Sequence, residues 1–98
     1  MKLSLLIAAS LLLAMPSTAS AELSDEEIFA VNLGMTAGTF STACIMLREG
    51  WISRDLVKNY GIGYMESVRK DFTGNSLAGS LKGLEISKEN HPNCPIPE

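Results

Sequence analysis

The uncharged stretch GMTAGTFSTACIML, Gly34 to Leu47, decides which fold this chain adopts. It belongs to a longer run without charge, Ile28 to Leu47. A helix of that length suits either a membrane span or the centre of a small protein. Polar residues within the run favour the second interpretation: Asn32, Thr36, Thr39, Ser41 and Thr42. We therefore expect a central, mainly buried helix.

The residues on either side of this run predict where the helix begins and ends. Ser24 and Glu27 have the S-x-x-E spacing of a capping box, in which each side chain binds the other residue's backbone N–H. Gly50 is the residue most easily placed in the left-handed conformation that follows a helix. The first helix is predicted over residues 24–49.

A second helix is predicted over residues 53–72, with Ser53 as its N-cap. Apolar residues recur at every fourth position: Leu56, Tyr60, Tyr64, Val68 and Phe72. Charged residues share the opposite side, so the helix is expected to be amphipathic. Gly61 and Gly63 are poor helix formers near its middle and predict a bend there.

A third helix is predicted over residues 76–90, capped by Asn75. Pro92 disfavours helix at the residue before it, so the tail 91–98 is expected to be an extended, proline-rich strap. The predicted fold is all-α: three helices, a long central first helix and a strap held by one disulfide.

The first 21 residues have the composition of a cleaved signal peptide. Lys2 precedes an apolar run from Leu3 to Met15, and the small residues before Glu22 suit cleavage after Ala21. No cysteine directly follows the run, so a soluble product is expected, either periplasmic or secreted. The mature chain, residues 22–98, is then a single small domain.

Cys44 and Cys94 are the only cysteines, and both lie in the exported part. In an oxidising compartment they predict one disulfide. Closing a loop of this size stabilises a fold by about 4 kcal/mol in the chain-entropy model. That is a large share of the stability of a domain whose core is small.

The charge of the mature chain argues against two classes of partner. Without Lys2 it has seven Lys or Arg against eleven Asp or Glu, so its net charge is −4. Nucleic acids and anionic membrane surfaces both favour clustered positive charge. We expect no nucleic-acid binding, no stable membrane insertion, and an unknown protein partner in the exported compartment.

Two pairs of glycines have G-x-x-x-G spacing: Gly34 with Gly38, and Gly79 with Gly83. Each pair leaves bare backbone on one helix face, where a second helix can approach closely. We favour close packing within the monomer. A contact between two copies in a homo-oligomer and a chance spacing are the alternatives.

The sequence offers little chemistry for catalysis or metal binding. It has a single histidine, His91, and neither a G-x-S-x-G nor an S-x-x-K motif. His91 and Cys94 would be half of a zinc site without a second pair of ligands, and a disulfide would remove Cys94. We expect no metal and no cofactor.

The favoured function is therefore a small exported binding or structural module that acts through protein–protein contact, not an enzyme. Trp51, Ile52 and Ile62 are the candidate interaction surface; the alternative, in which Trp51 fills the end of the core, is slightly favoured for that residue. A carrier of a small apolar ligand, lined by the methionines Met35, Met46 and Met65, is the second hypothesis. A small hydrolase is the third.

Overall fold

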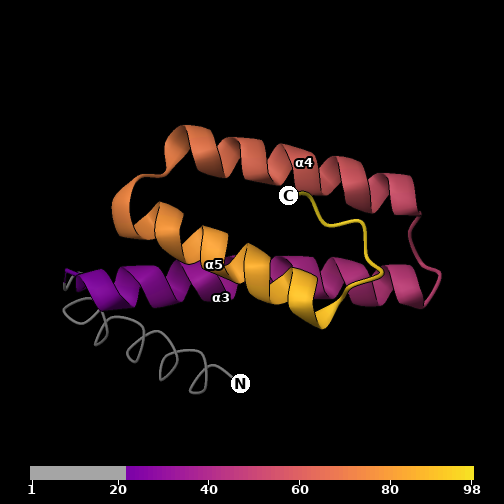
Figure 1. Ribbon diagram of the computed structural model, residues 1–98, viewed down its shortest axis with the longest axis horizontal. Coiled ribbons are helices and arrows are strands. Elements are labelled where there is room, and N and C mark those ends of the chain that lie inside the picture. Colours follow the sequence, from indigo (N-terminus) through magenta and orange to yellow (C-terminus); the bar gives the residue numbers. More distant parts are fainter. Residues whose placement is uncertain (1–21) are drawn as a thin grey trace, which may run out of the picture.

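The computed structural model describes residues 22–98, which contain three α-helices and no strand (Figure 1). Helix α3 spans Asp25–Arg48, α4 spans Arg54–Asp71 and α5 spans Gly74–Asn90. The all-α prediction is confirmed, and the helix ends differ from the predicted ones by one or two residues. The predicted signal peptide, residues 1–21, lies outside the described residues.

Local signals fix both ends of α3 as the sequence predicted. The Ser24 N–H donates to Glu27 Oε1 (3.3 Å), and the Glu27 N–H donates to Ser24 Oγ (3.2 Å). At the other end Gly50 has a φ of 79°. The Gly50 N–H donates to the Leu47 carbonyl (3.0 Å) and the Trp51 N–H to the Met46 carbonyl (2.9 Å), so the last turn closes as a Schellman motif.

The other two helices begin in different ways. Ser53 caps α4 as predicted, because its Oγ accepts the Leu56 N–H at 3.1 Å. The prediction that Asn75 caps α5 was wrong. The helix starts two residues earlier than predicted, at Gly74, whose φ of 56° turns the chain, and the N-cap Thr73 makes no side-chain hydrogen bond.

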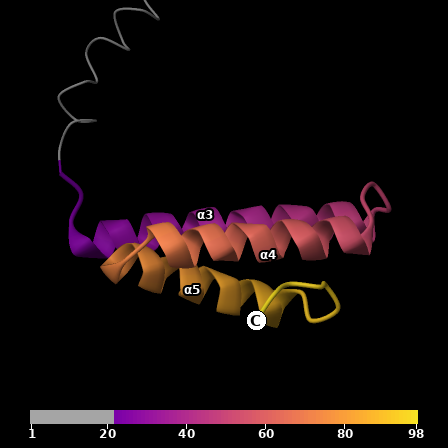
Figure 2. The same cartoon turned by 90° about the horizontal axis from the view of Figure 1, so that it is seen from above.

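The three helices do not form an even bundle, because α5 and the C-terminal tail lie together on one side of α3 and α4 (Figure 2). Helix α5 lies along α3, whereas α4 is set apart from α3, and the tail runs from the end of α5 toward α4 (Figure 1). Seen from above, α5 diverges from the other two helices toward its C-terminal end (Figure 2). Among the described residues, α3 therefore has a close helical neighbour along one side only.

Gly79 and Gly83 bring α5 against α3. A Cβ added at Gly83 would lie 2.5 Å from the Leu33 carbonyl oxygen and 3.1 Å from the Ala37 nitrogen. A Cβ at Gly79 would collide with the Phe29 carbonyl group. The bare faces of these two glycines thus rest directly on the α3 backbone, where any larger residue would force the helices apart.

The core lies between these helices and the tail. Its buried members come from all three helices and from the tail: Phe40, Cys44, Met65, Val68, Leu84 and Ile96. Tyr64 packs its ring edge-on against Phe40, with centroids 5.4 Å apart. Its hydroxyl lies 3.1 Å from Thr36 Oγ1, which satisfies the buried threonine.

The tail is held to both sides of the core. Cys44 and Cys94 form the predicted disulfide, with Cα atoms 5.7 Å apart. The Arg54 guanidinium donates to the Asn93 carbonyl at 3.0 Å. A Cβ added at Gly61 would lie 2.8 Å from Pro97 Cδ, so the tail sits directly on α4 at that glycine.

The expectation that α3 is mainly buried was wrong. Only 22% of an apolar 18-residue window of α3 is buried. By length and composition alone, the helix is also long and apolar enough to cross a membrane. Within the helix, the buried residues are Thr36, Phe40 and Cys44. The reason is the number of neighbours: α5 covers one side, and α4 stands too far off to cover the opposite one.

Candidate functional site

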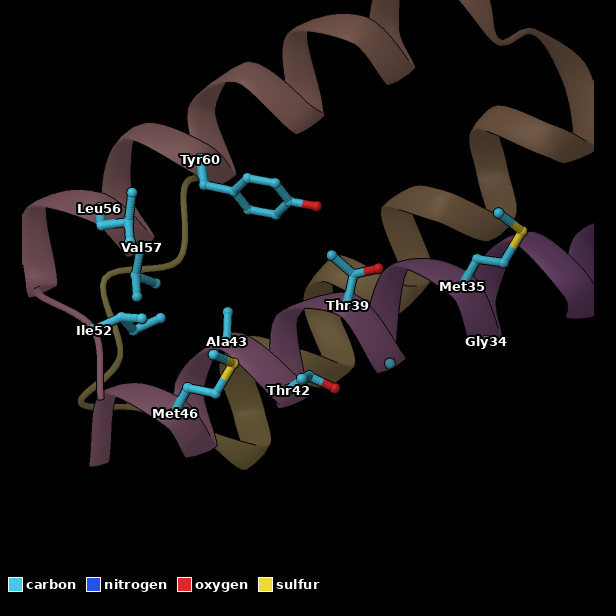
Figure 3. A pocket seen from close by; sticks show the side chains of 11 residues that line it. Gly34, Met35, Thr39, Thr42, Ala43, Met46, Ile52, Leu56, Val57 and Tyr60 are labelled. Carbon is cyan, nitrogen blue, oxygen red and sulfur yellow. The ribbon is translucent and has the colours of Figure 1, made fainter. Parts of the chain in front are cut away.

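The uncovered side of α3 and the neighbouring flank of α4 form a groove of about 660 Å³ (Figure 3). Its α4 wall is Leu56, Val57 and Tyr60, and Ile52 closes the end near the α3–α4 turn. The α3 wall consists of residues without charge: Gly34, Met35, Gly38, Thr39, Thr42, Ala43 and Met46. In Figure 3 the Met35 and Met46 side chains line α3, and Tyr60 points from α4 into the gap.

Helical geometry explains which side of α3 stays open. Successive residues are 100° apart around a helix, so positions three, four and seven residues apart share a face. Between the charged ends of α3, the exposed residues follow that spacing: Ala30, Val31, Gly34, Met35, Gly38, Thr42 and Ile45. Phe40 and Cys44 point the other way, toward α5 and the tail.

The apolar residues of α4 are divided between the core and the groove. A line of residues four apart advances about 40° per step around the helix. The predicted line therefore winds from the groove side, where Leu56 is 54% exposed and Tyr60 52%, to the core side, where Val68 is buried. One apolar face was predicted, and two neighbouring ones are found.

The groove can bind apolar groups and offers no chemistry beyond hydrogen bonding. Its side-chain polar atoms are the hydroxyls of Thr39, Thr42 and Tyr60, and no charged residue within 22–98 lines it. Because charged groups favour water over an apolar wall, an uncharged groove of this volume selects hydrophobic ligands or side chains.

The predicted interaction surface does not form one patch. Trp51 is 73% exposed in the α3–α4 turn, so it is not the core residue of the alternative interpretation. Ile52 belongs to the groove. Ile62 lies on the other flank of α4, in a hollow shared with the tail residues Ile96 and Pro97. Sequence reasoning did not identify Leu56 and Tyr60 as residues of the groove. Plotting the every-fourth positions around α4 would have shown that these two lie on a different side from Val68.

The two glycine pairs have different surroundings. Gly79 and Gly83 contact α3 as close packing requires, but a Cβ at Gly34 or Gly38 would meet no atom within 4 Å. The prediction of close packing within the monomer was therefore wrong for Gly34 and Gly38, because no helix among residues 22–98 covers that face. Both glycines line the groove instead.

The three methionines predicted to line a cavity do not lie together, and the possible metal ligands of residues 22–98 do not gather into a site. Met35 and Met46 line the groove, whereas Met65 is 1% exposed in the core. Within residues 22–98 no group of three or more His, Cys, Asp or Glu side chains is placed to hold a metal ion. Cys94 is in the disulfide, and His91 stands beside it at the end of α5.

Comparisons with known proteins return no counterpart. No protein-family model, no curated protein and no solved structure matches this chain. The groove between α3 and α4 is therefore interpreted from its own residues.

Proposed function

We propose that the mature chain is a small exported module that acts by protein–protein contact, with the groove between α3 and α4 as its contact surface. The observation that carries this proposal is the open, uncharged side of α3. Large apolar side chains on this side of α3 and on the facing flank of α4, such as Met35, Leu56 and Tyr60, are more than half exposed. Apolar surface left in water on one continuous face is typical of a binding site.

The proposed location is the periplasm or the outside of the cell. The Cys44–Cys94 disulfide and the apolar sequence before Glu22 fit an exported protein. N-terminal sequencing of the mature protein should begin at Glu22, and fractionation should find it soluble. Protein that stays in the membrane after a carbonate wash would contradict this location.

A photo-reactive amino acid at Met35 tests the contact surface directly. The control is the same amino acid at Leu81, which is 38% exposed on α5 and lies outside the groove. In the cell, irradiation should produce a discrete protein adduct from position 35 and none from position 81. Adducts from neither position, or equal adducts from both, would contradict the proposal.

A carrier of a small apolar ligand is the second candidate, favoured by the groove's volume. About 660 Å³ lies within the usual size range of small-molecule sites. The open groove makes this the weaker proposal, because such ligands are usually enclosed on most sides. The same photo-reactive variant separates the two functions, since a carrier would give an adduct of small mass at position 35.

A further inference from the structure

We propose that the groove's partner is a second copy of this chain, bound with the two α3 helices antiparallel across a two-fold axis. The inference rests on the proposed function, because it names the protein that would occupy the groove. An interface of this kind is isologous: the same surface of each copy contacts the other, so the surface must complement itself.

The charges of α3 favour the antiparallel direction. Its first turn contains Asp25, Glu26 and Glu27, and the residues Ile28 to Leu47 are uncharged. Its last turn contains Arg48, whose Nε lies 3.9 Å from the carboxylate of the C-cap residue Glu49, so this end has no net charge and the first turn is strongly negative. An antiparallel pair places the carboxylates of one copy beside this neutral end of the second copy and opposes the two helix dipoles favourably. A parallel pair would bring the two groups of carboxylates together.

The side-chain sizes on the open face complement each other in the same arrangement. The midpoint of α3 lies between Thr36 and Ala37. A two-fold axis there places Met35 opposite Gly38 of the second copy, and Val31 opposite Thr42. Met35 is 59% exposed, and nothing lies within 4 Å of a Cβ added at Gly38. The Met35 side chain of each copy thus packs on the bare backbone at Gly38 of the other copy, which gives two equivalent contacts related by the two-fold axis.

Helix α4 extends this surface. Its flank beside the groove contains the exposed, uncharged residues Leu56, Tyr60, Gly63 and Ser67, spaced four, three and four apart. A strip about 10 Å wide along α3 and α4, which are about 36 Å and 27 Å long, gives roughly 600 Å² per copy. Because protruding side chains add to the area of this flat strip, the buried area approaches that of a standard stable interface, about 800 Å² per partner.

A membrane surface fits the same face less well. The mature chain has a net charge of −4, and three of its carboxylates stand at one end of the open face. Anionic lipid headgroups would repel this end, and no cluster of lysines or arginines lines the groove to offset the repulsion.

Cysteine cross-linking tests the partner and the register together. In the proposed dimer Val31 lies beside Thr42 of the second copy, while the two Val31 residues are about 16 Å apart. The native cysteines are in the disulfide, so a short bismaleimide reacts only with introduced thiols. A mixture of Val31→Cys and Thr42→Cys should give heterodimers, and neither variant alone should cross-link.

Sedimentation equilibrium of the mature, oxidised protein measures the affinity. Gly38→Leu should leave the monomer folded, since its side chain enters open space, but it should weaken the dimer at least about tenfold by obstructing Met35 of the second copy. Met35→Lys should weaken it by roughly a hundredfold. Leu81→Lys, on the outer side of α5, is the control and should change the affinity less than about twofold.

Each alternative outcome overturns the inference in a recognisable way. Cross-linking of either variant with itself would indicate a parallel pair. A monomer at all concentrations that gives a protein adduct from position 35 would leave the proposed function standing with a different partner. A monomer that floats with anionic vesicles would assign the face to a membrane. A monomer with no adduct would contradict both proposals.

Discussion

A G-x-x-x-G pair lies on each side of α3, in α5 on the closed side and in α3 itself on the open side. In the part of the chain that the structure describes, only the pair on the closed side packs against another helix. On the closed side Gly79 and Gly83 of α5 press their bare faces against the α3 backbone. On the open side Gly34 and Gly38 meet no atom within 4 Å. The spacing makes a backbone approachable, but a helix must also be available to approach it. Residues 22–98 supply only two other helices and a tail, so within this part of the chain one side of α3 is left without a neighbour.

The largest expected effect comes from the strap that holds the closed side. Replacing Cys44 and Cys94 together by alanine should lower the free energy of unfolding by about 4 kcal/mol, because the unfolded chain regains the entropy of an open loop. Denaturant melts of the double variant, and of the native protein with and without reductant, measure it. Equal stability in both states would show that the closed side holds without the strap.

Alanine at the α5 glycines should be the next most damaging change. Gly83→Ala and Gly79→Ala each place a methyl group against the α3 backbone, which cannot yield as a side chain can. We expect each variant to lose about 1–3 kcal/mol or more from overpacking. The matched controls, Gly34→Ala and Gly38→Ala, should lose nothing in thermal or denaturant melts. Equal losses in both pairs would remove the distinction between the two sides.

Helix α4 contains its own version of this comparison. Gly61 lies under the Pro97 ring, whereas Gly63, two residues later, has nothing within 4 Å of an added Cβ. Gly61→Ala should therefore displace the tail at a net cost of about 1 kcal/mol. Gly63→Ala should instead stabilise the helix. If Gly61→Ala proves as stable as Gly63→Ala in melts, the tail is not seated on α4 as described.

The smallest effect concerns the open side alone. Gly38→Ala should stabilise the monomer by somewhat less than about 1 kcal/mol, since alanine is the better helix former and the added methyl meets no atom. The measurement belongs at protein concentrations where sedimentation shows a monomer. A destabilised monomer would mean that some part of the chain packs on this face after all.

The ends of α3, the start of α4 and the disulfide could be predicted from the sequence, because neighbouring residues fix those helix ends and the two cysteines have only each other as partners. Ser24 with Glu27, Gly50 and Ser53 act within one helical turn, so the ends of α3 and the start of α4 follow from neighbouring residues. Two cysteines can pair with each other in only one way. These predictions needed no knowledge of how the helices are arranged.

The groove required that arrangement and was therefore predicted poorly. An uncharged helix is buried only if enough other elements pack around it. The periodicity of a sequence does not show how many elements are available to do so. Every-fourth spacing predicts that Leu56 and Tyr60 share one apolar face with the core residues of α4. Such a line winds around the helix by about 40° per step, so both residues are exposed instead. The two α5 glycines and the two α3 glycines were equivalent until the structure placed them.

The exposed turn residue Trp51 has a consequence for following this protein in solution. It is the chain's single tryptophan, and with 73% of its surface in water its emission should already resemble that of free indole in the native state. Loss of the core would then change the intrinsic fluorescence little. Circular dichroism suits the melts better, while fluorescence quenching at Trp51 reports on the turn beside Ile52, where the groove ends.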